Sequence, residues 1–393
     1  MYFLTIITIF IFLSGFIENF FHQNRTKKIP VRIHVNGTRG KSTTVRLIAA
    51  SLREAGYRVL AKTTGTLPRV ILENGEEETI KRRGSANIIE QKHFIKKAFQ
   101  RKCNAIVIEC MAVHPETQWV SEHRLIHSTI GVITNVREDH QDVYGPRLKD
   151  AADALKMTVP KNGFLVTAED KYFPVIEKQA ELLNSKAIQV NTEKIVPEVD
   201  LKSENFYFED NVAIALKVGD LLGIKQDIIL QGIVKANPDP GALAIYRLQQ
   251  DKKYLWFINA FAANDRESIL LIWEKINNSL PENMKDSPKI AIINHRKDRI
   301  TRTIQFDKIL AKEIYPHHIL LVGDYIQLSE KKLIEFGYPS QQIIKIDKKK
   351  TVAQVFNNIF RLFEKSGIVY GLGNTRGFGL DIMEHLKEKG EKK

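Results

Sequence analysis

The fold of this chain is organised around one glycine-containing segment, Val35-Asn36-Gly37-Thr38-Arg39-Gly40-Lys41-Ser42-Thr43-Thr44. A short β-type run, Pro30 to Val35, precedes it, and a helical pattern of apolar residues follows it. The glycines let the backbone turn tightly, so that its N–H groups and the start of the helix can face an anion. A strand, a glycine turn, and then a lysine and a hydroxyl at a helix start form the layout of a phosphate-binding P-loop.

The residue types in this loop suit a nucleoside triphosphate. Lys41 can reach the β- and γ-phosphates, and the Ser42 hydroxyl can ligate Mg²⁺. The longest form of the motif has a glycine where this chain has Val35. A glycine-rich turn that binds no nucleotide is the alternative, but glycine spacing, lysine, hydroxyls and flanking periodicity all favour a nucleotide. The loop does not distinguish ATP from GTP.

The bulk composition indicates a folded protein of two domains. The chain has 393 residues, 43% of them hydrophobic and 27% charged, and a formal net charge of +13. A basic surface suits anionic lipid, nucleic acid or an acidic substrate. The charges are spread along the chain and no nucleic-acid motif is present, so we expect no nucleic-acid partner; a merely solvated basic surface stays an alternative. The two cysteines, Cys103 and Cys110, are expected to be free thiols.

The N-terminal segment predicts a membrane anchor helix over residues 1–22. Tyr2 to Ile17 carries no charge, and a spanning helix needs roughly 20 mostly apolar residues. A cleaved signal peptide would want a basic start and a small-residue cleavage site, which are missing, and a buried helix of a soluble domain is the other alternative. Basic residues follow directly, which places that side in the cytoplasm: Arg25, Lys27, Lys28 and Arg32.

Strand and helix patterns alternate from Val31 onward, which predicts an α/β fold with mostly parallel sheets covered by helices. The breaker cluster Asn237 to Gly241 marks a domain boundary. We expect a central P-loop domain over 30–243 and a smaller Rossmann-like domain over 244–393. Expected strands include Tyr57–Ala61, Ala105–Cys110, Thr129–Thr134 and Phe164–Thr167, then Tyr254–Ala260, Lys289–Asn294, His318–Val322, Ile343–Ile346 and Ile368–Tyr370.

Two further strand ends carry polar residues that belong with the loop. Glu109 ends the apolar run that begins at Ala105, and His140 lies in the segment Thr134 to Asp142 after another apolar strand. Ligands of open parallel sheets sit at the carboxyl ends of strands. A carboxylate there suits Mg²⁺, and a histidine can ligate a metal while a carboxylate orients its ring. We therefore expect a metal site formed by Ser42, Glu109 and His140.

At this point the chain resembles the Mur ligases and folylpolyglutamate synthetase, and within them the poly-γ-glutamate synthases of the CapB/PgsB type. The motifs that carry the resemblance run through nearly the whole chain. They are R-G-K-S-T in the loop, K-T-T-G-T at 62–66, N-I-I-E-Q-K at 87–92, E-C-M-A-V at 109–113, E-D-H-Q-D at 138–142, P-D-P-G-A at 238–242, F-A-A-N-D at 261–265 and D-R-I-T-R-T at 298–303.

The resemblance implies roles for individual residues. The ATP phosphates would be bound by Gly37, Thr38, Arg39, Gly40, Lys41, Ser42 and Thr43. Asn211 would contact adenine. Asn264, Arg299 and Arg302 would reach the nucleotide or the acyl phosphate from the second domain, with a hinge near Pro238 to Gly241; a solvated basic loop is the alternative for the two arginines. The implied catalytic residues are Lys41, Glu109, His140 and Arg302, and the implied cofactors are ATP and Mg²⁺.

The resemblance also implies an activity: ATP-dependent polymerisation of glutamate through γ-linkages, by way of a γ-glutamyl phosphate. Expected partners are glutamate, the growing chain, integral membrane subunits of a synthesis and export complex, and a second copy in a homo-oligomer. The expected location is the bacterial cell membrane, with the catalytic domains on the cytoplasmic side. The loop begins too early for a domain that binds a UDP-linked precursor. Folate polyglutamylation and a nucleotide-switched membrane scaffold ATPase are the alternatives.

Overall fold

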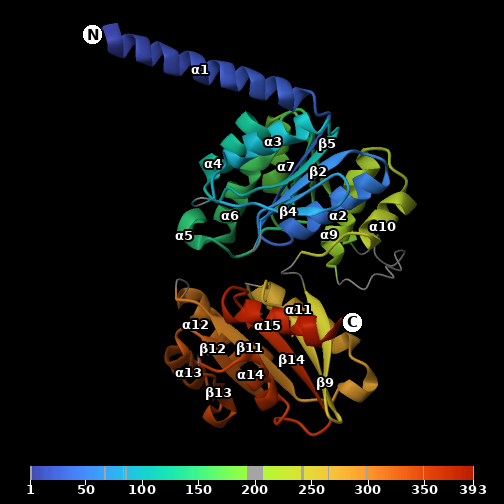
Figure 1. Ribbon diagram of the computed structural model, residues 1–393, viewed down its shortest axis with the longest axis vertical. Helices are drawn as coiled ribbons and strands as arrows, with labels where there is room; N and C mark the ends of the chain where they lie inside the picture. Colours follow the sequence, from blue (N-terminus) through green and yellow to red (C-terminus); the bar gives the residue numbers. More distant parts are fainter. Residues whose placement is uncertain are drawn as a thin grey trace. The chain divides into compact units, whose positions relative to one another are not determined.

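The computed structural model describes residues 2–65, 68–82, 84, 86–192, 207–239, 243–263, 265–297, 300–347 and 349–392. These residues form two compact units, one up to Asp239 and one after it. Each unit has its own sheet and its own apolar core (Figure 1). The predicted α/β architecture with an N-terminal apolar helix is thereby confirmed.

The first unit is organised around a sheet of eight strands in the described residues, in the order β4-β3-β2-β5-β1-β6-β7-β8. The run from β2 to β8 is parallel, and β3 and β4 extend it as antiparallel strands beside β2. The strands are β1 (Val31–Asn36), β2 (Val59–Thr63), β3 (Arg69–Ile71), β4 (Glu77–Thr79), β5 (Ala105–Glu109), β6 (Ile130–Ile133), β7 (Phe164–Thr167) and β8 (Lys186–Gln189).

Helices cover both faces of this sheet. Ile33 and Val35 of β1 belong to the core shared with α2 (Lys41–Glu54), α9 (Glu209–Leu221) and α10 (Gln226–Val234). Alternate residues of a strand face opposite sides, so His34 and Asn36 face the other layer. That layer contains α3 (Glu90–Gln100), α4 (Pro115–Val120), the π-helical turn η1 (Ser121–Ile126), α6 (Leu148–Leu155) and α7 (Phe173–Leu182); α5 (Gln141–Tyr144) and η2 (Lys156–Thr158) connect its members.

The second unit repeats the architecture with seven strands in its described residues, in the order β13-β12-β11-β14-β10-β9-β15. Its strands are β9 (Ala244–Gln250), β10 (Lys253–Asn259), β11 (Lys289–His295), β12 (His318–Gly323), β13 (Ile343–Lys345), β14 (Ser366–Gly373) and β15 (Glu391–Lys392). Its helices are α11 (Arg266–Ser279), α12 (Ile300–Ile309), α13 (Ile326–Glu335), α14 (Val352–Ile359) and α15 (Phe378–Lys389), with short turns η3 (Glu282–Met284), η4 (Leu310–Ile314) and η5 (Ser340–Gln342). The antiparallel β9, beside β10, is a strand that the sequence patterns did not predict.

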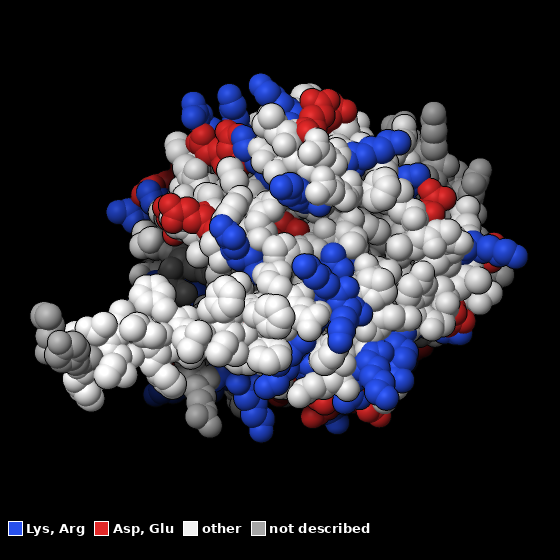
Figure 2. Space-filling model, turned by 90° about the horizontal axis from the view of Figure 1, so that it is seen from above, with Lys and Arg blue, Asp and Glu red and all other residues white. Residues whose placement is uncertain are grey.

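The helix α1 (Tyr2–Lys27) extends beyond the anchor predicted for residues 1–22. Its apolar side chains from Phe3 to Phe21 are exposed, and Figure 2 shows it as a run of uncharged side chains leaving a surface with many Lys and Arg. Its last turns are part of the folded unit. His22 and Thr26 are buried, and His22 Nε2 lies 2.8 Å from the Leu125 carbonyl oxygen. The helix therefore joins the apolar segment rigidly to the first unit.

The helix that begins at the phosphate loop, α2, is held at backbone contact with α10. A Cβ atom added at Gly232 would lie 2.4 Å from the Cα of Ser51 and 2.7 Å from its nitrogen. The Ser51 hydroxyl also donates to the Ile229 carbonyl at 3.1 Å. Because backbone atoms cannot move aside as a flexible side chain can, any larger residue at Gly232 must push the two helices apart.

We predict that Gly232→Ala destabilises the first unit. Overpacking of a core contact costs about 1–3 kcal/mol, which exceeds the roughly 1 kcal/mol that alanine gains over glycine in a helix. Chemical denaturation of the purified protein measures the change. Gln231→Ala is the matched control, since Gln231 is exposed on the same helix and its loss should matter little. Equal stability of the two variants would show that the helices separate without cost.

Candidate functional site

The loop between β1 and α2 has a backbone that requires both of its glycines. Gly37 has φ +125° and Gly40 has φ +83°, values that side-chain-bearing residues rarely adopt. Space is equally limiting: a Cβ at Gly37 would lie 2.0 Å from Thr134 Oγ1, and one at Gly40 would lie 2.4 Å from Asn211 Oδ1. The expected tight turn is present, and it is fixed by residues from β6's end and from α9.

Hydrogen bonds tie the loop to the segment after β6. The Thr38 nitrogen donates to the Asn135 carbonyl oxygen at 3.0 Å, and the Arg39 nitrogen donates to Asn135 Oδ1 at 3.0 Å. Thr134 Oγ1 donates to the Arg39 carbonyl oxygen at 2.6 Å. Groups of the chain itself therefore hold the loop in its turned conformation, and such preorganisation lowers the entropic cost of binding.

Lys41 lies at the first position of α2 and folds back over the loop. Its Nζ donates to the carbonyl oxygens of Gly37 at 2.6 Å and Thr38 at 3.1 Å. Burial lowers the pKa of Lys41, although the nearby Glu109 carboxylate opposes that effect. An ammonium held by neutral carbonyls can exchange them for phosphate oxygens, which attract it more strongly.

Glu109, at the end of β5, meets Ser42 as the sequence predicts. Ser42 Oγ donates to Glu109 Oε2 at 2.8 Å, and the Thr64 nitrogen donates to the same oxygen at 2.7 Å. A hydroxyl and a carboxylate are the oxygen donors that Mg²⁺ prefers, so this pair fits the metal. In the described residues there is no cluster of three or more His, Cys, Asp or Glu side chains that could hold a metal ion. Mg²⁺ commonly binds through one or two carboxylates together with substrate phosphates and water.

A cavity of about 180 Å³ opens at this edge of the sheet. It brings together residues from five segments: Asn36, Gly37, Thr38 and Lys41 at the glycine loop; Thr64 after β2; Arg82 and Ala86 between β4 and α3; Cys110, Met111, Ala112 and Val113 after β5; and Asp139, His140 and Tyr144. His140 thus lines the same cavity as Lys41. Its φ of +47° places it in the left-handed region just before α5, and Asp139 Oδ2 lies 3.8 Å from its Nε2. Asp139 also pairs with Arg39, at 3.1 Å.

Of the four predicted nucleotide contacts beyond the glycine loop, one is buried behind the loop, one lies in the second unit, and two lie outside the described residues. Asn211 is buried at the start of α9, where it accepts a hydrogen bond from Thr44 Oγ1 at 3.1 Å and packs behind the loop; it does not line the cavity. Its role as an adenine contact remains a prediction. Asn264 and Arg299 lie outside the described residues. Arg302 is half-buried on α12 in the second unit, and Thr43 is half-buried in the first turn of α2.

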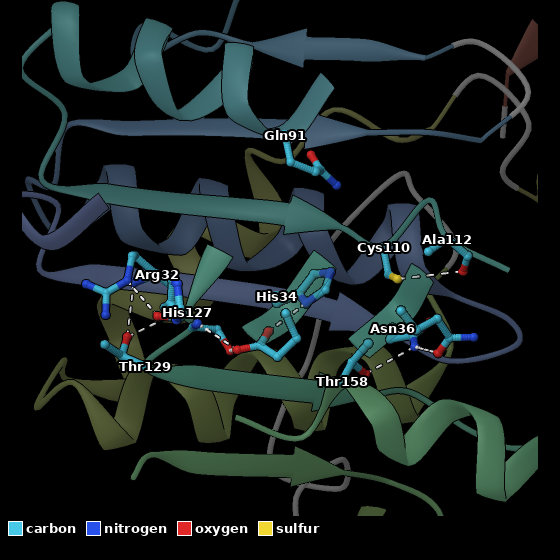
Figure 3. A network of polar contacts seen from close by, with 12 residues as sticks. Arg32, His34, Asn36, Gln91, Cys110, Ala112, His127, Thr129 and Thr158 are labelled. Carbon is cyan, nitrogen blue, oxygen red and sulfur yellow. Dashed lines mark hydrogen bonds and ion pairs between the residues drawn. The ribbon is translucent and has the colours of Figure 1, made fainter. Parts of the chain in front are cut away.

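A buried polar network on β1, which the sequence analysis did not identify, reaches the cavity at Asn36 (Figure 3). His34 Nδ1 lies 2.8 Å from Glu122 Oε2, and Asn36 Nδ2 donates to Gln118 Oε1 at 2.7 Å. Burial would lower the pKa of His34, but Cys110 and Glu122 more than offset this effect and raise it to about 9. The signal was available: three polar residues, Arg32, His34 and Asn36, alternate with three apolar ones in this strand.

Comparisons with known proteins agree with this geometry. Residues 35–225 match the Mur ligase middle domain, and residues 245–389 match the poly-gamma-glutamate synthase CapB C-terminal domain. The chain is 36% identical to capsule biosynthesis protein CapB of Bacillus anthracis, across 98% of this chain and 82% of that protein. It is 37% identical to PGA synthase CapB of Bacillus subtilis (strain 168), across 99% of this chain and 98% of that protein.

Among solved structures, the chain is similar to E. coli FolC in complex with ADP. The TM-score is 0.67 at 16% identity, with 93% of this chain and 90% of that chain covered. A likeness at this identity concerns the fold. The near full-length similarity to two CapB proteins and the matching CapB C-terminal domain show that this chain belongs to the poly-γ-glutamate synthase CapB family.

Proposed function

We propose that this protein is an ATP-dependent amide ligase that joins glutamate residues through γ-linkages. The observation that carries the proposal is the meeting of Lys41, Ser42 and Glu109 at one edge of the first sheet, in a chain of the CapB family. ATP would supply a phosphoryl group to a γ-carboxylate, and the amine of another glutamate would then attack the resulting acyl phosphate. The E. coli FolC structure in complex with ADP supports nucleotide binding by this fold.

In this proposal the residues of the chain position charges and take no covalent part. Residues 37–43 would bind the phosphates, mainly through the N–H groups at the N-terminus of α2, because the N–H groups of Thr38 and Arg39 already donate to Asn135. Lys41 would leave the carbonyl oxygens of Gly37 and Thr38 and stabilise the charge that develops on the transferred phosphoryl group. Ser42 and Glu109, with His140 at the same cavity, would hold Mg²⁺, which would neutralise phosphate charge when bound.

The proposed location is the bacterial membrane, with both units on the cytoplasmic side. Among the described residues, α1 is the helix that is long and apolar enough to cross a membrane, with a mean hydropathy of 1.9 in its most apolar window. Arg25 and Lys27 in its last turn support the cytoplasmic orientation of the folded unit. Integral membrane subunits and a second copy of the chain are proposed partners. Nucleic acid is not.

We predict that Glu109→Gln and His140→Ala each lower Mg²⁺-dependent turnover by about 10²-fold or more, because each removes a metal ligand from a phosphoryl-transfer site. Glutamate-dependent ADP release by membranes that contain the protein measures the effect. Glu116→Gln is the control, since Glu116 is exposed on α4 a few residues beyond β5. Near-normal turnover in both site variants would contradict the proposal that Glu109 and His140 are metal ligands. ADP release at the same rate with and without glutamate would favour the alternative function, a nucleotide-switched membrane scaffold ATPase.

The α1 anchor gives a second prediction. The full-length protein should sediment with membranes and resist carbonate extraction, whereas a protein that starts after Phe21 should be soluble and folded. A protein that starts after Thr26 should be less stable, because it lacks the buried His22 and Thr26 and the contact with Leu125. Fractionation and thermal unfolding measure these outcomes. Recovery of the full-length chain in the soluble fraction would contradict the anchor.

Arg302 on α12 gives a third prediction. We expect Arg302→Ala to weaken ligation more than it weakens binding of a non-hydrolysable ATP analogue, because the residues proposed to bind phosphate lie in the first unit. Calorimetry measures binding, and glutamate-dependent phosphate release measures ligation. Lys308→Ala, an exposed lysine on the same helix, is the control. Parallel losses would make Arg302 a simple nucleotide contact, and no loss would leave it a solvated basic residue.

A further inference from the structure

Two sequence motifs, one beginning at Lys62 and one containing Glu90 and Gln91, have no role in the proposed phosphate or metal site, yet they meet in the structure. Lys62 is buried at 1% exposure in β2. Its Nζ lies 3.0 Å from Glu90 Oε2 and donates to Gln91 Oε1 at 3.2 Å. A buried lysine is costly unless it is paired, so this position requires the acid and the amide on α3.

The same carboxylate holds a second cation, Arg82, in the segment between β4 and α3. Arg82 Nε donates to Glu90 Oε1 at 2.7 Å, and its Nη2 donates to Glu90 Oε2 at 3.2 Å. Burial would raise the pKa of Glu90, but its bonds to Arg82 and Lys62 lower it. One carboxylate therefore serves two basic side chains, and the cluster of Lys62, Arg82 and Glu90 keeps an excess of positive charge.

That excess is presented to the cavity. Arg82 lines the cavity that contains Lys41, whereas Lys62 and Glu90 do not line it. The guanidinium is fixed through Nε and Nη2, and within the described part of the chain its Nη1 donates no hydrogen bond. Glu90, which also pairs with the buried Lys62, therefore holds Arg82 in place and leaves one edge of its guanidinium available.

The strand order separates Arg82 from the groups that serve the phosphates. Along the sheet edge, β2 comes first, then β5 with Glu109, then β1 with the glycine loop, then β6 with the segment that holds His140. Arg82 contacts Glu90, whose partner Lys62 lies on β2, and Arg82 shares the cavity lining with Thr64 just after that strand. Arg82 therefore lies on the β2 side of the glycine loop. A substrate whose reacting group approaches the phosphates of ATP from that side would have its other end near Arg82.

We propose that Arg82 is a substrate-binding residue that receives a carboxylate of the glutamyl substrate. A planar guanidinium fork matches a carboxylate in a bidentate geometry, and glutamate and poly-γ-glutamate carry such groups beside the reacting one. Lys41 and the N-terminus of α2 already serve the phosphates. Lys62 and Glu90 are positioning residues that fix the guanidinium. This inference rests on the ligase activity proposed above.

The test measures glutamate and nucleotide separately in the full-length protein in membranes. We expect Arg82→Gln to raise the KM for glutamate by about 10- to 100-fold, the equivalent of one charged hydrogen-bonded contact, and Arg82→Lys to raise it less. Calorimetry on the detergent-solubilised protein should give the same affinity for a non-hydrolysable ATP analogue in all variants. Arg69→Gln is the matched control, because Arg69 lies on β3, bonds to Thr79 at 2.8 Å and does not line the cavity.

Each outcome decides the proposal. A raised KM with unchanged analogue affinity, seen at Arg82 and absent at Arg69, supports it. Weakened analogue affinity in Arg82→Lys, which keeps the charge and the fold, would make Arg82 a phosphate contact and overturn it. An unchanged KM in Arg82→Gln would also overturn it while leaving the ligase intact. If the unmodified protein makes no polymer from glutamate, it is the ligase activity that fails.

Discussion

The first unit depends on the close approach of the glycine loop to its neighbours. At Gly37 and Gly40 the backbone adopts conformations that other residues avoid, and Thr134 and Asn211 fill the space that a side chain would need. Both neighbours come from distant parts of the chain, one after β6 and one on α9. The loop can hold its shape only when the sheet and α9 are assembled, and this shape leads directly into the N-terminus of α2.

The strand order then brings polar side chains together at the carboxyl edge of the first sheet. The central strands β2, β5, β1 and β6 are parallel neighbours, so their carboxyl ends share one edge of the sheet. Thr64, Glu109, Lys41 and His140 follow those four strand ends or lie at them. A single carboxylate oxygen of Glu109 accepts from both the Ser42 hydroxyl and the Thr64 nitrogen. The edge therefore presents ammonium, hydroxyl and amide donors beside a carboxylate, the kinds of groups that phosphoryl transfer uses.

Two polar pairs connect one helical layer of the first unit to its sheet. His34 with Glu122 ties η1 to β1, and Lys62 with Glu90 ties α3 to β2. A pair of this kind is costly to desolvate, and it is satisfied in few arrangements of the two elements. Glu90 of the second pair also holds Arg82, so this pair helps to position a side chain that lines the cavity.

Residue types and their spacing are enough to predict the elements that have strong local signals. The glycine loop, the apolar α1, the parallel alternation and the placement of Glu109 beside Ser42 all follow from residue types and periodicity, because strand ends of a parallel sheet meet at one edge. Neither β9 nor β8 was predicted, and the anchor helix was predicted to end at residue 22, because the local pattern does not show that His22 and Thr26 are buried or that His22 contacts the Leu125 carbonyl oxygen of η1. Three features are seen only in the folded chain: Asn211 lies behind the loop, Lys62 contacts Glu90, and Arg82 lines the cavity. Those contacts join residues far apart in the sequence, and the local pattern around each one carries no information about its partner.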